Sequence, residues 1–101
     1  MYQTIGDISV FVLSGDLDDF YGKQLLKSLV RLIQTEWVKI ILDFKHVGHV
    51  NFKVMTDLIS LMVAAHSMNG YIKIANLNPY HRSILKASGI EDFFERVRQR
   101  S

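Results

Sequence analysis

Apolar positions follow two different periods along the chain, and each change of period indicates a new element of secondary structure. Short runs rich in β-branched and aromatic residues predict strands. These strands are Tyr2–Ile5, Ile8–Leu13, Trp37–Phe44 and Tyr71–Ala75. The first two fit an antiparallel hairpin that turns at Gly6-Asp7.

Longer segments, in which a polar stripe recurs at helical spacing, predict four helices. These helices are Phe20–Gln34, Phe52–Met68, Asn78–Gly89 and Glu91–Arg98. The stretch from Ser14 to Asp18 is expected to break the preceding strand, and either Asp18 or Asp19 is expected to cap the first helix. Asn69-Gly70 supplies a stop for the second helix, and Pro79 suits the first turn of the third.

The order of these elements predicts the architecture. Trp37–Phe44 is almost continuously apolar, which is typical of a strand with parallel neighbours and both faces buried. Strands that are joined through helices indicate crossovers within a sheet that contains parallel pairs. We therefore expect one α/β domain over residues 1–101, with a mixed sheet of about four strands packed with about four helices.

Composition narrows the functional classes. The 101 residues contain no cysteine, which excludes disulfides, thiolate metal sites and cysteine nucleophiles. A formal net charge of +2 gives no reason to expect nucleic-acid binding. The basic run near the C-terminus, Arg96–Arg100, fits a solvated helix end that suits the helix dipole. We expect a cytoplasmic protein, because no segment resembles a signal peptide or a membrane span.

Catalytic and metal-binding chemistry find little support in the sequence. His46 and His49 have a spacing that can chelate zinc, but no nearby acidic or thiolate residues complete a ligand set, so solvated loop histidines are expected. Asp43, placed at the end of a predicted strand, has no partner motif for acid–base work. Nucleophile and phosphate-loop motifs are also missing. The sequence therefore predicts no enzyme activity, no metal site and no cofactor.

Three separated segments resemble the STAS domain family, the family of bacterial anti-sigma factor antagonists. Ser14-Gly15-Asp16-Leu17-Asp18 is similar to the family's Ser-Gly-Glu-Leu-Asp opening. Ile41–Phe44, followed by Val47 and Val50, resembles its central strand and switch loop. Asn78-Pro79, through Ile84-Leu85 to Ser88-Gly89-Ile90, resembles its closing pattern.

The resemblance departs from the family at the switch itself. Members carry Asp-Ser-Ser-Gly or Asp-Ser-x-Gly there, and a kinase partner phosphorylates a serine. This chain has Asn51, Phe52, Lys53 and Val54 instead. Asn51 keeps the capping ability, but Phe52 and Lys53 form a degenerate phosphosite without a hydroxyl. Lysine also carries the opposite charge to a phosphoserine. Thr56 is the nearest hydroxyl that a kinase could use in their place.

The resemblance implies a non-catalytic domain that regulates sigma factors, and so transcription, by binding a serine-kinase-type anti-sigma factor or a related ATPase. Because loops after parallel strands meet at one edge of a sheet, two segments far apart in sequence are expected to form this surface. The residues assigned to it are Ser14, Gly15, Asp16, Asp18, Asn51, Phe52, Lys53, Thr56 and Asp57.

Three alternatives remain open in the sequence. Phe52 could fold inward as a hydrophobic staple instead of contacting a partner. The domain could be a structural adaptor of a transport or stress-signalling assembly, in which case a constitutive oligomer is expected. It could also be a small-ligand sensor, for which the sequence offers no pocket-forming motif.

Overall fold

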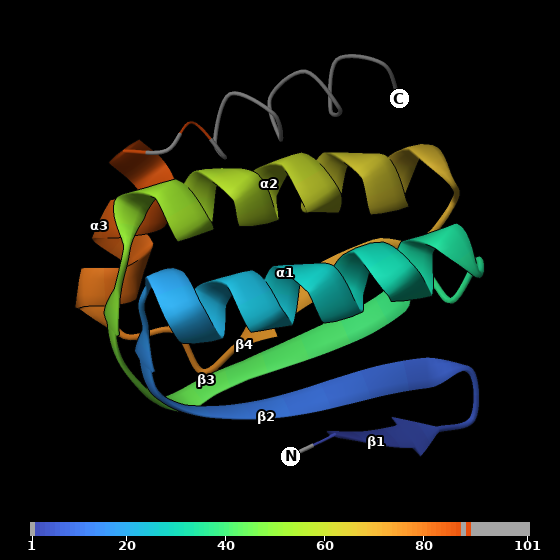
Figure 1. Ribbon diagram of the computed structural model, residues 1–101, viewed down its shortest axis with the longest axis horizontal. Helices are drawn as coiled ribbons and strands as arrows, with labels where there is room; N and C mark the ends of the chain where they lie inside the picture. Colours follow the sequence, from blue (N-terminus) through green and yellow to red (C-terminus); the bar gives the residue numbers. More distant parts are fainter. Residues whose placement is uncertain (1, 88, 90–101) are drawn as a thin grey trace.

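The computed structural model describes residues 2–87 and 89, in which four strands form one mixed sheet in the order β1-β2-β3-β4 (Figure 1). β1 pairs with β2 antiparallel, and β2–β3 and β3–β4 are parallel pairs. The strands are β1 (Tyr2–Ile5), β2 (Ile8–Leu17), β3 (Lys39–Val50) and β4 (Tyr71–Ala75). The helices of the described part are α1 (Asp19–Gln34), α2 (Phe52–Ser67) and α3 (Pro79–Ala87). The expected α/β class and mixed four-stranded sheet are confirmed.

The predicted hairpin and most helix ends are also confirmed. Ile5 pairs with Ile8 across a two-residue turn, in which Gly6 takes the positive φ of +62° that a tight hairpin needs. Asp18, and not Asp19, caps α1. The fourth predicted helix, Glu91–Arg98, and the basic run Arg96–Arg100 lie outside the described residues.

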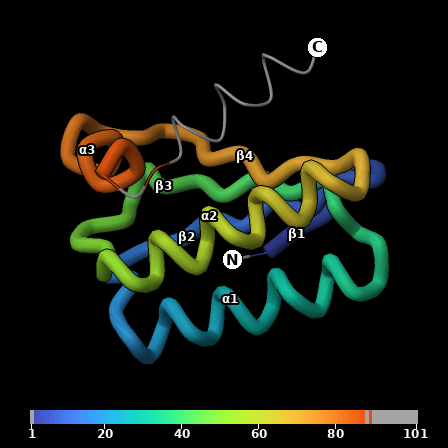
Figure 2. Tube along the Cα trace, turned by 90° about the horizontal axis from the view of Figure 1, so that it is seen from above, coloured from blue at the N-terminus to red at the C-terminus, as the bar shows by residue number. Residues whose placement is uncertain are grey.

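α1 and α2 lie side by side over one face of the sheet, and α3 lies at the end where β3 leads into α2 (Figures 1 and 2). The core forms between these two helices and the inner face of the strands. Its most buried members come from α1, β3 and α2, and include Leu29, Ile40, Leu42, Met55 and Leu58. None of the helices in the described residues is both long and apolar enough to cross a membrane.

Two predicted loops are in fact strand. β2 continues through Ser14 to Leu17, and β3 continues past Phe44 to Val50, so Ser14–Asp18 does not break the strand where it was expected to. The extended ends pair with each other, with Ser14 opposite His46 and Leu17 opposite Val50. Two register irregularities accommodate the turn-forming residues, and burial of Leu17 and Val50 stabilises the pairing.

The bounds of β3 correct three further expectations. Asp43 lies in the middle of β3 and not at its end, and His46 and His49 are strand residues and not loop residues. The predicted strand also begins too early, because Trp37 precedes β3 and its side chain is 45% exposed.

Candidate functional site

The two segments that the sequence assigns to one surface lie next to each other in the structure. The backbone N–H of Asn51 donates to the carbonyl oxygen of Leu17 at 2.9 Å. The backbone N–H of His49 donates to Asp16 Oδ1 at 2.8 Å. The ends of β2 and β3 therefore deliver the first turns of α1 and α2 to the same edge of the molecule (Figure 1).

Aspartate and asparagine side chains cap these two helices and fix their starting points. Asp18 Oδ1 accepts hydrogen bonds from the backbone N–H groups of Phe20 and Tyr21, at 3.0 and 2.9 Å. Asn51 Oδ1 accepts in the same way from Lys53 at 2.8 Å and from Val54 at 3.4 Å. Each cap satisfies amide groups that would otherwise lack a partner at a helix N-terminus.

A third contact joins the starts of the two helices. Asn51 Nδ2 donates to Asp19 Oδ1 at 3.4 Å, so this amide links the cap of α2 to the first residue of α1. An aspartate at position 51 would place two carboxylates at this contact, whereas the amide offers a donor. Sequence reasoning assigned Asn51 a capping role and a place on the partner surface, but it did not place Asp19 at the site.

Ser14, Gly15 and Asp16 form an exposed rim beside the caps. Gly15 has a φ of +83°, a conformation that favours glycine. Asp16 reaches the His49 amide only because its neighbour in β3 is also a glycine: a Cβ on Gly48 would lie 2.6 Å from Asp16 Oδ1.

Aromatic side chains are exposed around the capped helix ends. Phe52 is 55% exposed, so it does not fold inward as a hydrophobic staple. Phe20 and Tyr21 in the first turn of α1 are 64% and 59% exposed, and their rings meet edge to face at 5.3 Å. No sequence pattern assigned Phe20 and Tyr21 to the surface, because their exposure depends on where α1 begins relative to the sheet.

The remaining assigned residues lie along the first turns of α2. Lys53 and Asp57 are exposed, and neither forms an ion pair within the described part of the chain. Thr56 is half-buried, and its hydroxyl donates to the backbone oxygen of Lys53 at 2.8 Å. The surface therefore combines aromatic rings with charges of both signs.

A second group of contacts, which sequence reasoning missed, fixes α3 against β3. The Tyr80 hydroxyl lies 2.6 Å from His49 Nδ1, and His81 Nε2 donates to the Gly48 carbonyl at 2.9 Å. The His81 ring is fully buried and meets Phe44 edge-on at 5.3 Å. This burial depends on a carbonyl 33 residues away, so no local pattern in the sequence predicts it.

Other ionisable groups of the sheet form hydrogen bonds and an ion pair within the fold. The Asn76 amide donates to Asp43 at 2.9 Å, and together with the Lys45 backbone N–H it lowers the pKa of this carboxyl. The exposed Asp7–Lys39 ion pair, at 2.8 Å, lowers the pKa of Asp7 and raises that of Lys39. Within residues 2–87 and 89, no group of three or more histidine or acidic side chains is placed to hold a metal ion.

Comparison with known proteins assigns this arrangement to a family. The STAS domain model matches residues 1–101. The chain belongs to the STAS domain family. This membership supports a regulatory role, and it confirms the resemblance carried by the three sequence segments. No similar sequence was found among curated proteins.

Solved structures share the fold at low sequence identity. The unphosphorylated anti-sigma factor antagonist SpoIIAA has a TM-score of 0.76 and 18% identity, over 97% of this chain and 96% of SpoIIAA. The NMR structure of TM1081 has a TM-score of 0.75 and 13% identity, over 90% of this chain and 74% of TM1081. Mglu has a TM-score of 0.67 and 13% identity over 78% of this chain, which spans only 20% of Mglu.

Proposed function

We propose that this STAS domain is a non-catalytic regulator that binds a protein partner through the first turns of α1 and α2. The partner that suits the family is a serine-kinase-type anti-sigma factor or a related ATPase. The assigned surface consists of Ser14, Gly15, Asp16, Asp18, Asn51, Phe52, Lys53, Thr56 and Asp57, and we add Phe20 and Tyr21 to it.

The exposure of Phe52 carries this proposal. An aromatic side chain that is 55% exposed at a rigidly capped helix start gains free energy when a partner covers it. Phe20 and Tyr21 enlarge the apolar area beside it, and Lys53 adds a charge that forms no ion pair within the described residues. Aromatic residues with charged neighbours are enriched at protein interfaces.

Regulation by phosphorylation at the usual serine is not part of this proposal, because Phe52 and Lys53 offer no hydroxyl. Thr56 is a poor substitute, since the residue is half-buried and its hydroxyl donates to the Lys53 carbonyl within the helix. We therefore expect no phosphate on the first turns of α2 when the domain is incubated with its kinase-type partner and ATP. Mass spectrometry that locates phosphate on Thr56 would contradict this expectation.

Reversing the charge of Lys53 tests the surface. We expect Lys53→Glu to weaken binding to a serine-kinase-type anti-sigma factor from the same organism by at least tenfold, about 1.4 kcal/mol, measured by calorimetry. A glutamate in the first turn of α2 suits the helix dipole, so the variant should remain folded. Lys86→Glu makes the same change of charge at an exposed residue of α3. It is the matched control and should bind the partner normally.

An unchanged affinity in Lys53→Glu would remove this surface from consideration. The alternative function, a structural adaptor of a transport or stress-signalling assembly, requires a permanent interface and no switch. Light scattering coupled to size exclusion separates the two functions: a monomer favours transient regulation, and a constitutive oligomer favours the adaptor.

A further inference from the structure

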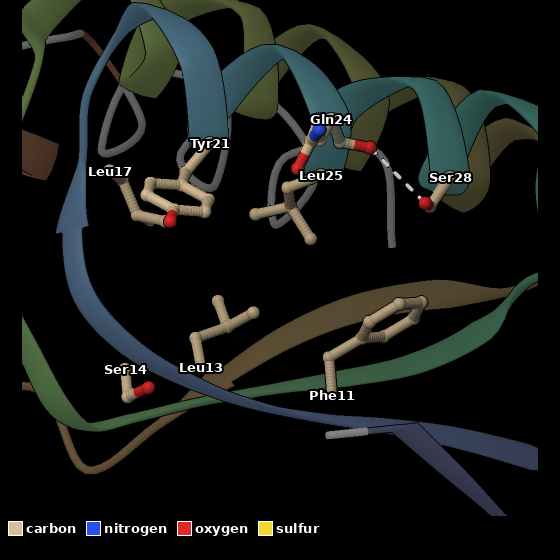
Figure 3. A pocket seen from close by; sticks show the side chains of 8 residues that line it. All are labelled: Phe11, Leu13, Ser14, Leu17, Tyr21, Gln24, Leu25 and Ser28. Carbon is tan, nitrogen blue, oxygen red and sulfur yellow. Dashed lines mark hydrogen bonds between the residues drawn. The ribbon is translucent and has the colours of Figure 1, made fainter.

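An open groove lies along the side of α1 that faces the β1–β2 hairpin. One hollow of about 190 Å³ lies between Phe11 and Leu13 of β2 and Tyr21 and Leu25 of α1 (Figure 3). Figure 3 shows these side chains pointing toward one another across the space between helix and strand. Most of its lining is apolar, although it lies at the edge of the domain.

A second hollow, of about 310 Å³, continues the first toward the C-terminal end of α1. Tyr2 and Phe11 form its strand side, and Arg31 and Leu32 contribute from the helix. Phe11 and Ser28 line both hollows, so the two form one elongated groove. From Tyr21 to Leu32 the helix rises roughly 16 Å, at about 1.5 Å per residue.

The shape and lining of the groove restrict its occupant. An elongated, open and mostly apolar groove suits an extended hydrocarbon chain, which gains free energy when it leaves water. Phe11 is only partly buried and lies against the core in the middle of the groove, where the hydrocarbon chain would cover it.

One end of the groove carries a cation. Arg31 lines the second hollow, and within the described residues its guanidinium forms no ion pair. A guanidinium binds a carboxylate through two parallel hydrogen bonds, and this pairing is strengthened next to apolar surface. An apolar groove that ends at an arginine is complementary to a hydrocarbon chain that ends in a carboxylate.

We propose that this groove is a binding site for a fatty acid, with the acyl chain along Phe11 and the carboxylate on Arg31. The groove shares Ser14 and Tyr21 with the protein-binding surface proposed above, but Phe52 and Lys53 do not line it. Each additional methylene buried in the groove should tighten binding by up to about fourfold.

Decanoate is a suitable probe, used below its micelle concentration with the whole chain. We expect saturable binding by calorimetry, with NMR shifts concentrated around Phe11, Ser28 and Leu32. Octanoate should bind about tenfold more weakly, because it lacks two methylenes. Decanol should also bind more weakly than decanoate, because it has no carboxylate for Arg31.

Three variants test separate parts of the proposed groove. Ser28→Phe places a ring where the two hollows meet and should weaken decanoate binding at least tenfold; Ser28 is exposed, so the fold should tolerate the change. Arg31→Gln should remove the preference for decanoate over decanol. Lys27→Gln removes the same charge from a neighbouring residue that does not line the groove, and should bind like the unmodified chain.

Several results would overturn the proposal. These are an absence of saturable binding, shifts spread over the whole surface, or equal losses in Arg31→Gln and Lys27→Gln. Binding that survives Ser28→Phe unchanged would also exclude this groove. Because Lys53 does not line the groove, Lys53→Glu tests the regulatory function separately, and failure of the fatty-acid site leaves that function intact.

Discussion

Gly22 lies in α1 where this helix packs directly against Val54 of α2, and replacing it by alanine tests that packing. In an isolated helix, Gly→Ala stabilises by about 1 kcal/mol. In this domain the added Cβ would overlap Val54 Cγ2 and would lie 2.9 Å from Val54 Cγ1. Val54 is 3% exposed and β-branched, so its methyl groups cannot easily rotate away.

The two effects of Gly22→Ala have opposite signs. Overpacking of a tight core costs about 1–3 kcal/mol, which exceeds the gain in helix propensity. We therefore expect Gly22→Ala to lower the free energy of unfolding by about 1 kcal/mol, and the melting temperature by roughly 4–8 °C. Urea unfolding followed by circular dichroism measures this change. A variant that is more stable than the unmodified domain would refute the packing argument.

A double-mutant cycle isolates the contact between the two helices. Val54→Ala alone should destabilise by about 2 kcal/mol, because it removes buried methyl groups. In the Gly22→Ala background the same change also relieves the overlap, so it should cost at least about 1 kcal/mol less. Strict additivity of the two single changes would show that Gly22 and Val54 do not compete for space.

Two further predictions concern single polar side chains. Asn51→Ala should destabilise the domain by about 1 kcal/mol in urea unfolding, because α2 loses its cap, whereas Asn51→Ser keeps a capping oxygen and should lose much less. Asn76→Gly keeps the positive φ of 61° but removes the hydrogen bond that lowers the pKa of Asp43. A lowered carboxyl pKa stabilises the fold above the ordinary value near pH 3.8, and this contribution is lost as the pH falls through the folded-state value. The stability difference between Asn76→Gly and the unmodified domain should therefore narrow between pH 5 and about pH 2, and a constant difference would contradict the role of Asp43.

Features set by neighbouring residues could be predicted from the sequence. The Gly6-Asp7 hairpin, the cap at Asn51 and the proline start of α3 each depend on a few consecutive residues, and the structure has all three. Their physics is local: a positive φ, a side-chain acceptor for free amides, and a fixed proline φ.

Features set by pairing across the fold could not be predicted in this way. Ser14, Gly15 and Asp16 are turn formers, yet they lie in β2 because β3 runs beside them and Leu17 gains burial. His81 is likewise buried only because the Gly48 carbonyl faces it. In both cases a partner more than 30 residues away overrides the local preference.

The same distinction applies to the candidate surface. Its location followed from topology, since the ends of β2 and β3 had to meet, but the exposure of its aromatic rings depends on how far α1 and α2 extend past the sheet. Asn51 matters most here, because it caps α2 and also reaches Asp19 of α1. An amide performs both tasks without charge, so the shape of the junction does not depend on the acidic residue or the serine that the family usually carries there. Under the proposed function, a partner would recognise this shape and its exposed rings without a phosphorylation switch. Lys53→Glu and the search for phosphate on Thr56 therefore test separate halves of the proposal.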